Sequence, residues 1–170
     1  TIESPTDTTT KISPYTNKTL QTKAILAITS TALIIKLSEF LETTPSFSES
    51  IQQQLTYLNL LPTGEINLFI MIAAALTQWV ILDRTLSALL VAIIVSIGGP
   101  LSELPFVASG FWEYIPSASD YFPLQGWNLA FLSDYQDLAL SSITGPCYFA
   151  VTMDAIALGR WFDTMDDQID

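Results

Sequence analysis

The side chains that could do chemistry in this chain are ionisable groups placed inside or beside long apolar runs. Asp154 precedes Arg160 by six residues, which places it about 9 Å deeper along a helix. An ionisable group at such depth in a membrane usually faces a bundle interior or a cavity. It could bind a polar ligand or relay protons, and a small transporter could combine Asp154 with Glu103 or Lys36. The structural alternative is a hydrogen bond with a neighbour such as Thr152.

The sequence contains few residues suited to other kinds of catalysis. The chain has no histidine, so the usual histidine general bases and nucleophile–histidine pairs are excluded. No spacing of ligand types resembles a zinc or haem site, and we predict neither a catalytic residue nor a protein-held metal centre. A separate hypothesis concerns Glu39, Glu103 and Glu113. Each of these carboxylates could ligate the magnesium of a chlorophyll, directly or through water.

Two dipeptides, Asp83-Arg84 and Gly159-Arg160, end long apolar runs and contain the only arginines of the chain. Arg84 and Arg160 could together hold an anionic lipid headgroup. They could instead form ion pairs at helix ends with Asp83 or Asp163. The two interpretations differ in whether the guanidinium groups are free to meet a ligand.

Glycine and proline interrupt two of the apolar runs. Gly98-Gly99-Pro100 should kink or break one helix, and Gly145-Pro146 lies near the start of another. Small residues at such places allow helices to approach closely. A gap between broken helices would admit a lipid, a sterol, or a pigment such as chlorophyll or carotenoid.

The composition is typical of a membrane-embedded helical bundle. The chain of 170 residues is 49% hydrophobic and 14% charged, whereas an ordinary soluble domain is about 25% charged, and its mean hydropathy is +0.41. A spanning helix needs about 20 mostly apolar residues, so the chain has room for about four spans in a single all-α domain. The net charge of −11 leaves no basic patch for nucleic acid. The lone Cys147 cannot form an internal disulfide.

The apolar runs and their polar boundaries divide the chain into a polar N-terminal tail, a transmembrane helical domain and an acidic C-terminal tail. These cover residues 1–21, 22–162 and 163–170. The expected helices are 22–41, 65–82, 85–104 and 138–162. A shorter amphipathic helix over 51–61 could lie in the membrane interface. Residues 106–126, rich in aromatic residues and proline, suit an interfacial or partly re-entrant loop.

Positive charge predicts the orientation of these spans. With four spans, five cations fall on one face together with both termini, which is then the stromal or cytoplasmic side: Lys11, Lys18, Lys23, Arg84 and Arg160. Only Lys36 lies on the opposite face, among nine acids: Glu39, Glu42, Glu49, Glu65, Glu103, Glu113, Asp120, Asp134 and Asp137. Those acids would suit a basic partner there, or they form a solvated rim.

The sequence starts at Thr1, without an initiator methionine or a signal-peptide pattern. We expect that a targeting peptide has been removed, with import into a plastid or mitochondrion as the natural history. The acidic face and the processed start favour a plastid thylakoid over a mitochondrial membrane.

The second half of the chain resembles the insulin-induced gene (INSIG) family of membrane proteins. In that family one helix ends in Trp-Trp-x-Phe-Asp-Arg, and here Trp79 leads to Asp83-Arg84. The family motif Asn-Gly-Val-Tyr-Gln-Tyr is similar to residues 109–114, Ser-Gly-Phe-Trp-Glu-Tyr. The family's last helix runs from Pro-Cys to Gly-Arg, as do Pro146-Cys147 and Gly159-Arg160 here. The resemblance covers roughly residues 65–162.

The match is incomplete. The family has six spans, and its small and polar residues near the last helix are replaced here, for example by Met153 and Asp154, which puts sterol binding in doubt. The resemblance implies a non-enzymatic bundle that binds a lipid-like molecule or another membrane protein through its helix faces.

Three functions therefore stay open. The first is a non-catalytic accessory or scaffold subunit that contacts other membrane-protein subunits and the bilayer, specifically in a photosystem complex, with chlorophyll, carotenoid or lipid bound. The second is an INSIG-like lipid or sterol sensor. The third is a small transporter that uses buried acids.

Overall fold

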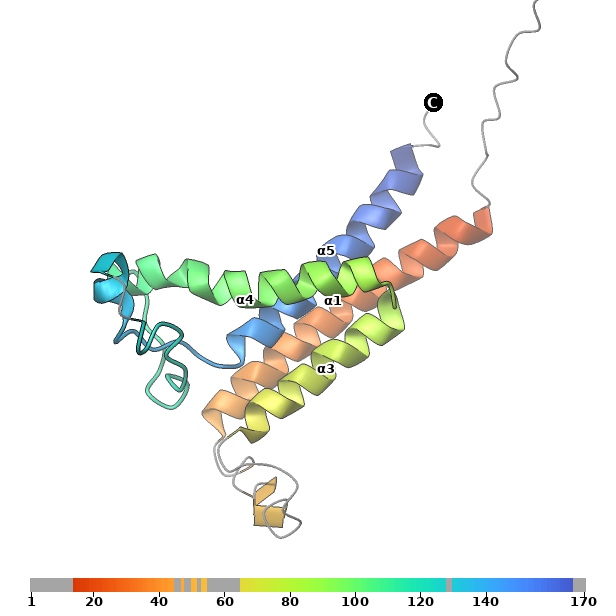
Figure 1. The fold of residues 1–170 in the computed structure, drawn as a ribbon. Helices are drawn as coiled ribbons and strands as arrows, with labels where there is room; N and C mark the ends of the chain where they lie inside the picture. Colours follow the sequence, from red (N-terminus) through yellow and green to blue (C-terminus); the bar gives the residue numbers. More distant parts are fainter. Residues whose placement is uncertain are drawn as a thin grey trace, which may run out of the picture.

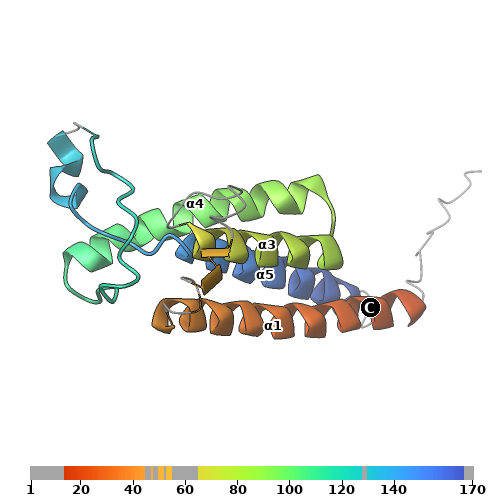
Figure 2. The same cartoon turned by 90° about the horizontal axis from the view of Figure 1, so that it is seen from below.

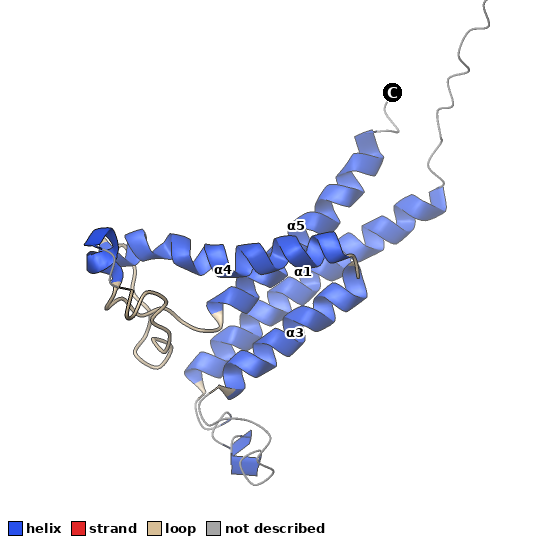
Figure 3. Cartoon of the chain, in the orientation of Figure 1, coloured by secondary structure: helices blue, strands red, loops and turns tan. Residues whose placement is uncertain are grey.

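Helices make up all the regular structure that is described. The computed structural model describes residues 14–44, 47, 50, 51, 53, 54, 65–127 and 130–166. The elements are α1 (Pro14–Thr43), α3 (Ile66–Leu82), α4 (Leu86–Ala108), the short 3₁₀ helix η1 (Ala130–Tyr135) and α5 (Thr144–Asp166) (Figure 3). The expected all-α bundle of four packed helices is confirmed.

Helix α5 holds the bundle together, because it contacts α1, α3 and α4. Helices α1, α3 and α5 run side by side in both views, whereas α4 turns away from α3 after their shared turn (Figures 1 and 2). Beyond α4, an irregular segment that contains η1 returns the chain to α5. Within it, Tyr121 and Leu140 form an isolated antiparallel bridge.

The short turn between α3 and α4 is held by local hydrogen bonds of its polar residues. Helix α3 is a 17-residue apolar run that ends where Asp83 and Arg84 begin. Arg84 has a positive φ of 64°, in the left-handed region that ends many helices. Thr85 then caps α4, its side chain accepting a hydrogen bond from the Ala88 amide.

Helix α4 continues without a break through Gly98, Gly99 and Pro100, and through a second proline, Pro105. The expected break is therefore absent. A proline removes one backbone hydrogen bond, in this case the bond to the Ser96 carbonyl, and a long helix tolerates this where neighbouring segments pack on it. Gly145 of α5 lies directly against that carbonyl, since an added Cβ there would stand 2.9 Å from the Ser96 oxygen.

The helix ends differ from the expected ones by more than two residues at four places, one of which is the end of α5 at Asp166. Helix α1 begins at Pro14, because proline suits the first turn of a helix. Helix α4 runs on to Ala108. Helix α5 begins at Thr144 and not at residue 138, since Leu140 is held extended in the bridge to Tyr121. The amphipathic segment 51–61 lies largely outside the described residues, as do residues 1–13 and 167–170.

The central cluster of the bundle is rich in small residues, whereas its other buried clusters contain large ones such as Leu41, Met71 and Leu140. The central cluster is built mainly from buried alanines and Met153: Ala27, Ala75, Ala88, Ala92, Met153 and Ala157. Large side chains that are at least half exposed stand on the same helices: Ile25, Ile28, Leu33, Ile81, Leu86, Leu90, Ile94 and Ile97. Surface side chains of a water-soluble bundle are mostly polar, so this number of exposed large aliphatic residues is unusual for one.

Two of the helices are long and apolar enough to cross a membrane, judged by length and composition: Lys18–Thr43, within α1, and α4. Only 28% of the most apolar stretch of the first and 22% of that of the second are buried. Core helices of soluble proteins that pass the same test are mostly buried, so these two differ from them. Helix α3 is also apolar but is shorter, at 17 residues.

Candidate functional site

Most of the described lysine and arginine side chains lie toward one end of the bundle, which we call the positive end. The start of α1, the α3–α4 turn and the end of α5 lie toward the same end of the bundle in both views (Figures 1 and 2). Lys18 and Lys23 stand on α1, Arg84 in the turn and Arg160 on α5. This is the grouping that the charge pattern predicted, although Lys11 lies outside the described residues.

An ion pair links the α3–α4 turn to α5 at this end. The Arg160 guanidinium lies 2.5 Å from Oδ2 of Asp83, whose side chain is only 3% exposed. Oδ1 of Asp83 accepts a hydrogen bond from the Thr85 amide at 3.0 Å. Burial raises the pKa of Asp83, but the hydrogen bonds from Thr85 and the guanidinium of Arg160 outweigh it and hold the pKa below its ordinary value. The pair therefore ties the α3–α4 turn to α5.

Arg84 takes a different role from Arg160. Its Nε donates a hydrogen bond to the Val80 carbonyl at 2.6 Å, and its side chain is exposed. Of the two alternatives for the arginines, Arg160 adopts the ion pair with Asp83, whereas the outer face of Arg84 stays open to solvent or headgroups.

Asp154 lies on the central helix as a partly buried carboxyl group. Its Oδ1 is buried and has no hydrogen-bond partner among the described residues. The hydroxyl of Thr152 donates instead to the Tyr148 carbonyl, one turn back on α5. The structural alternative of a Thr152–Asp154 bond is thus absent, and no cation contacts Asp154 in the described part of the chain.

Gln78 is a polar residue at the bundle centre that the sequence analysis did not single out. Its amide donates hydrogen bonds to the hydroxyls of Ser30 and Thr31 at 2.9 and 2.8 Å. Thr31 in turn donates to the Ala150 carbonyl at 3.2 Å. These bonds link α3, α1 and α5, while Oε1 of Gln78 is buried without a partner among the described residues. A glutamine inside an otherwise apolar run was the available signal.

Glu103 lies near the far end of α4, with both carboxylate oxygens engaged. Tyr148 donates to Oε1 at 2.9 Å, and Tyr114 donates to Oε2. The Tyr114 hydroxyl also lies 3.2 Å from that of Thr144. Burial, followed by the bond to Glu103, raises the pKa of Tyr114 well above its ordinary value. The ring of Tyr148 sits against Gly99, where an added Cβ would lie 2.5 Å from the ring.

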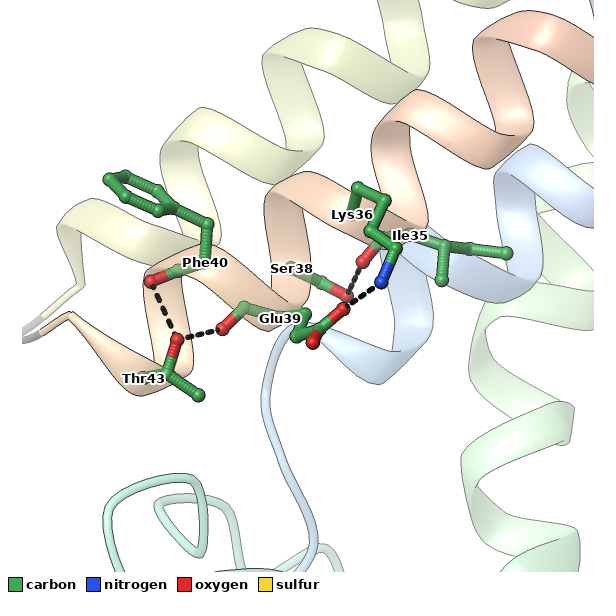
Figure 4. Close-up of polar contacts among 6 residues, drawn as sticks. All are labelled: Ile35, Lys36, Ser38, Glu39, Phe40 and Thr43. Carbon is green, nitrogen blue, oxygen red and sulfur yellow. Dashed lines mark hydrogen bonds and ion pairs between the residues drawn. The ribbon is translucent and has the colours of Figure 1, made fainter.

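The three glutamates considered as chlorophyll ligands do not converge. Glu39 pairs with Lys36 at 2.5 Å on the exposed face of α1, where nearby hydroxyls bond back to their own helix (Figure 4). Glu113 is exposed on the loop after α4, and Glu103 is held by the two tyrosines. No group of three potential metal-ligating side chains occurs within the described ranges.

Two further acids accept hydrogen bonds from the segment that follows α4. Glu42, at the end of α1, accepts a hydrogen bond from the Ser141 hydroxyl at 2.8 Å. Asp120 accepts from both the amide and the hydroxyl of Ser142, at 2.8 and 2.7 Å. At least part of the acidic face therefore consists of carboxylates that position the entry to α5.

A cavity of about 650 Å³ opens between α3 and α4. Ala75 of α3 and Ile97 of α4 line it, and Gly145-Pro146 at the start of α5 forms part of its wall. Tyr121 and Trp127 border it from the segment after α4. Its size falls within the range of roughly 300–1,000 Å³ that is usual for small-molecule sites.

A shallower groove of about 390 Å³ runs between α1 and α3, lined by Ser30, Leu33, Ala73, Ala74 and Gln78 among others. Small residues of this kind permit another helix to approach closely. The cavity and the groove thus lie on opposite sides of α3.

No family model, curated protein or solved structure matches this chain. The resemblance to the INSIG family consequently stays a prediction.

Proposed function

We propose that this chain is an integral membrane protein with a non-catalytic role, an accessory or scaffold subunit whose outer faces bind lipids and the helices of partner subunits. The observation that carries the proposal is the large number of exposed aliphatic side chains on the outer faces of the helices, which surround a central cluster rich in alanine. Apolar surface on this scale marks contact with a membrane or with other proteins. Transmembrane helices, moreover, associate through small residues.

The charge distribution supports the same proposal. The described cations other than Lys36 gather at the end where the α3–α4 turn meets α5, and the exposed glutamates of the α1 end and the post-α4 segment lie at the other. A bundle that spans the bilayer through α1, α3, α4 and α5 would place these cations on the stromal or cytoplasmic side. Helix α3 is short for a span, but helices of about 17 residues are within the usual range.

We favour a photosynthetic membrane as the setting and a photosystem complex as the assembly, with lipid, carotenoid or chlorophyll as bound molecules. The support is indirect, namely the acidic end and the large area of apolar helix surface left for partners. Mild-detergent purification from native membranes tests it, with an absorption spectrum and mass spectrometry of the co-purifying molecules. Pigment and photosystem polypeptides are expected, and a pigment-free, solitary chain would contradict this setting.

A second candidate function is an INSIG-like lipid sensor. It is favoured by the cavity between α3 and α4, and by the ion pair that joins two motifs of the resemblance, Asp83-Arg84 and Gly159-Arg160. The transporter hypothesis has less support, because Lys36 pairs with Glu39 and Glu103 with two tyrosines, apart from Asp154.

Membrane insertion itself is tested with cysteine labelling. In a Cys147→Ser background, Ser87→Cys marks the positive end and Gln125→Cys the opposite end, both at exposed positions. An impermeant maleimide added to sealed vesicles should label only one of the two until detergent opens the membrane. Labelling of both from one side, or release of the protein by alkaline carbonate, would refute the spanning arrangement.

A further inference from the structure

The cavity between α3 and α4 exists because the two helices separate after a tight turn. They follow one another in the chain, and each packs on α5, but they make no substantial contact with each other. Figure 1 shows α4 turning away from α3. The space between them is therefore not filled by helix packing, and the segment after α4 folds over one end of it, placing Tyr121, Leu124 and Trp127 in its lining.

The lining of this cavity is aliphatic over most of its length and more polar at one end. Aliphatic side chains of α3 and α4 form most of it, and its exposed rim includes Ile72, Leu76 and Ile97, which are 39%, 42% and 61% exposed. In the proposed spanning arrangement that rim faces the hydrocarbon, so a lipid chain could enter sideways.

Most polar side chains of the lining lie at the end formed by the post-α4 segment and the approach to α5, while Ser96 of α4 donates its hydroxyl hydrogen to the Ile93 carbonyl. Tyr121 and Trp127 line the cavity there, and neither side chain donates a hydrogen bond to another described residue. Ser142, which is partly exposed, also lines it and uses its hydroxyl hydrogen on Asp120, so that only its acceptor lone pairs stay available. This end thus offers hydrogen-bond donors from Tyr121 and Trp127 and acceptors from Tyr121 and Ser142.

The charges behind this polar end restrict what the head of a ligand can be. Ser141 donates to Glu42 and Ser142 to Asp120, so two carboxylates stand directly behind the lining. The only described cation at this end, Lys36, is already paired with Glu39. A phosphate or carboxylate head would meet like charge with nothing to offset it, whereas a hydroxyl meets donors and acceptors of the right kind.

We propose that this cavity binds an uncharged long-chain lipid, its hydroxyl head at Tyr121 and Trp127 and its chain between α3 and α4. The inference rests on the proposed membrane function and adds to it a site and a ligand class. The ligand would come from the bilayer and would be selected against anionic lipids. A pocket with a few placed polar groups in an apolar lining is typical of such selectivity.

The test uses the full-length chain in phosphatidylcholine nanodiscs. The probes are octadecanol carrying a diazirine in its chain, and the matching octadecyl phosphate, each photolysed and mapped by mass spectrometry. Cross-links to α3 and α4 peptides at the cavity should be about tenfold stronger with the alcohol, and excess unlabelled octadecanol should suppress them. Equal labelling by both probes would show ordinary bilayer contact and overturn the proposal.

Three variants locate the site. Ser96→Phe places a ring in the cavity and should reduce specific labelling about tenfold, whereas Val91→Phe, on an exposed part of α4 outside the cavity lining, should change it less than about twofold. Tyr121→Phe removes only the hydroxyl, because the bridge to Leu140 uses backbone atoms. It should lower the preference for the alcohol about three- to tenfold.

Two failures can be told apart. A protein that carbonate extracts from membranes refutes the proposed function. A protein that stays in the bilayer but labels without headgroup preference, or labels equally in Ser96→Phe and Val91→Phe, refutes the lipid site alone.

Discussion

The ion pair between Asp83 and Arg160 should be a principal fastening of the positive end, and its loss should be measurable. Arg160→Gln removes the cation from a carboxylate that is 3% exposed and leaves it with the Thr85 amide. Removing one partner of a fully buried pair costs about 3–5 kcal/mol. Because Arg160 is 44% exposed, water screens this pair, and we expect a loss of roughly 2 kcal/mol in the free energy of unfolding.

Asp83→Asn should cost less, about 1 kcal/mol, since an amide oxygen can still accept from the Thr85 amide. The double variant should then lose about 1 kcal/mol less than the sum of the two single variants, because the pair can be broken only once. Unfolding in mixed micelles with increasing denaturing detergent provides the four free energies of this cycle.

Arg84→Gln is the matched control. It removes the other arginine, whose guanidinium is exposed and, among the described residues, donates to the Val80 carbonyl, so it should change the free energy of unfolding by less than about 0.5 kcal/mol. Additive losses from Asp83→Asn and Arg160→Gln, with a coupling under about 0.5 kcal/mol, would refute the reasoning.

Two other perturbations have defined outcomes. The folded state lowers the pKa of Asp83, so the contribution of its carboxylate to stability is present above the unfolded pKa of about 3.9 and is lost as pH falls through the folded pKa. Below about pH 4, the melting temperature of the wild type should therefore fall more steeply than that of Asp83→Asn. Parallel curves of melting temperature against pH would contradict this. Gly99→Ala should destabilise by about 1–3 kcal/mol, since its Cβ would lie 2.5 Å from the Tyr148 ring. Gly98→Ala, with nothing within 4 Å, should be neutral or slightly stabilising in the same denaturation assay.

The sequence predicted those parts of the fold that depend on local pattern. The uncharged, mostly apolar run before Asp83 placed α3 to within one residue, and Asp83-Arg84 marked the turn after it. The start of α1 differed because its first turns are polar, and Pro14 could equally open a helix or end one. The continuity of α4 through Pro100 depends on how α5 packs against it, which periodicity does not contain.

The candidate site was predictable only as a set of alternatives. A pair between an arginine and Asp83 was one of two interpretations, and the choice between Arg84 and Arg160 required the three-dimensional meeting of α5 with the α3–α4 turn. The tyrosines around Glu103 come from the loop and from α5, so no local spacing identified them. Nor does a sequence indicate that α3 and α4 separate, which is what produces the cavity.

The central position of α5 has a consequence for how the chain is made. Asp83 is synthesised well before Arg160, so its carboxylate has no cationic partner until α5 has been made. Helices α1, α3 and α4 all contribute to the central cluster, which is complete only when Phe149, Met153 and Ala157 of α5 are present. Arrested synthesis before Thr144 would therefore leave α4 without its main packing partner, and in the proposed spanning arrangement such a fragment would be a substrate for membrane quality control.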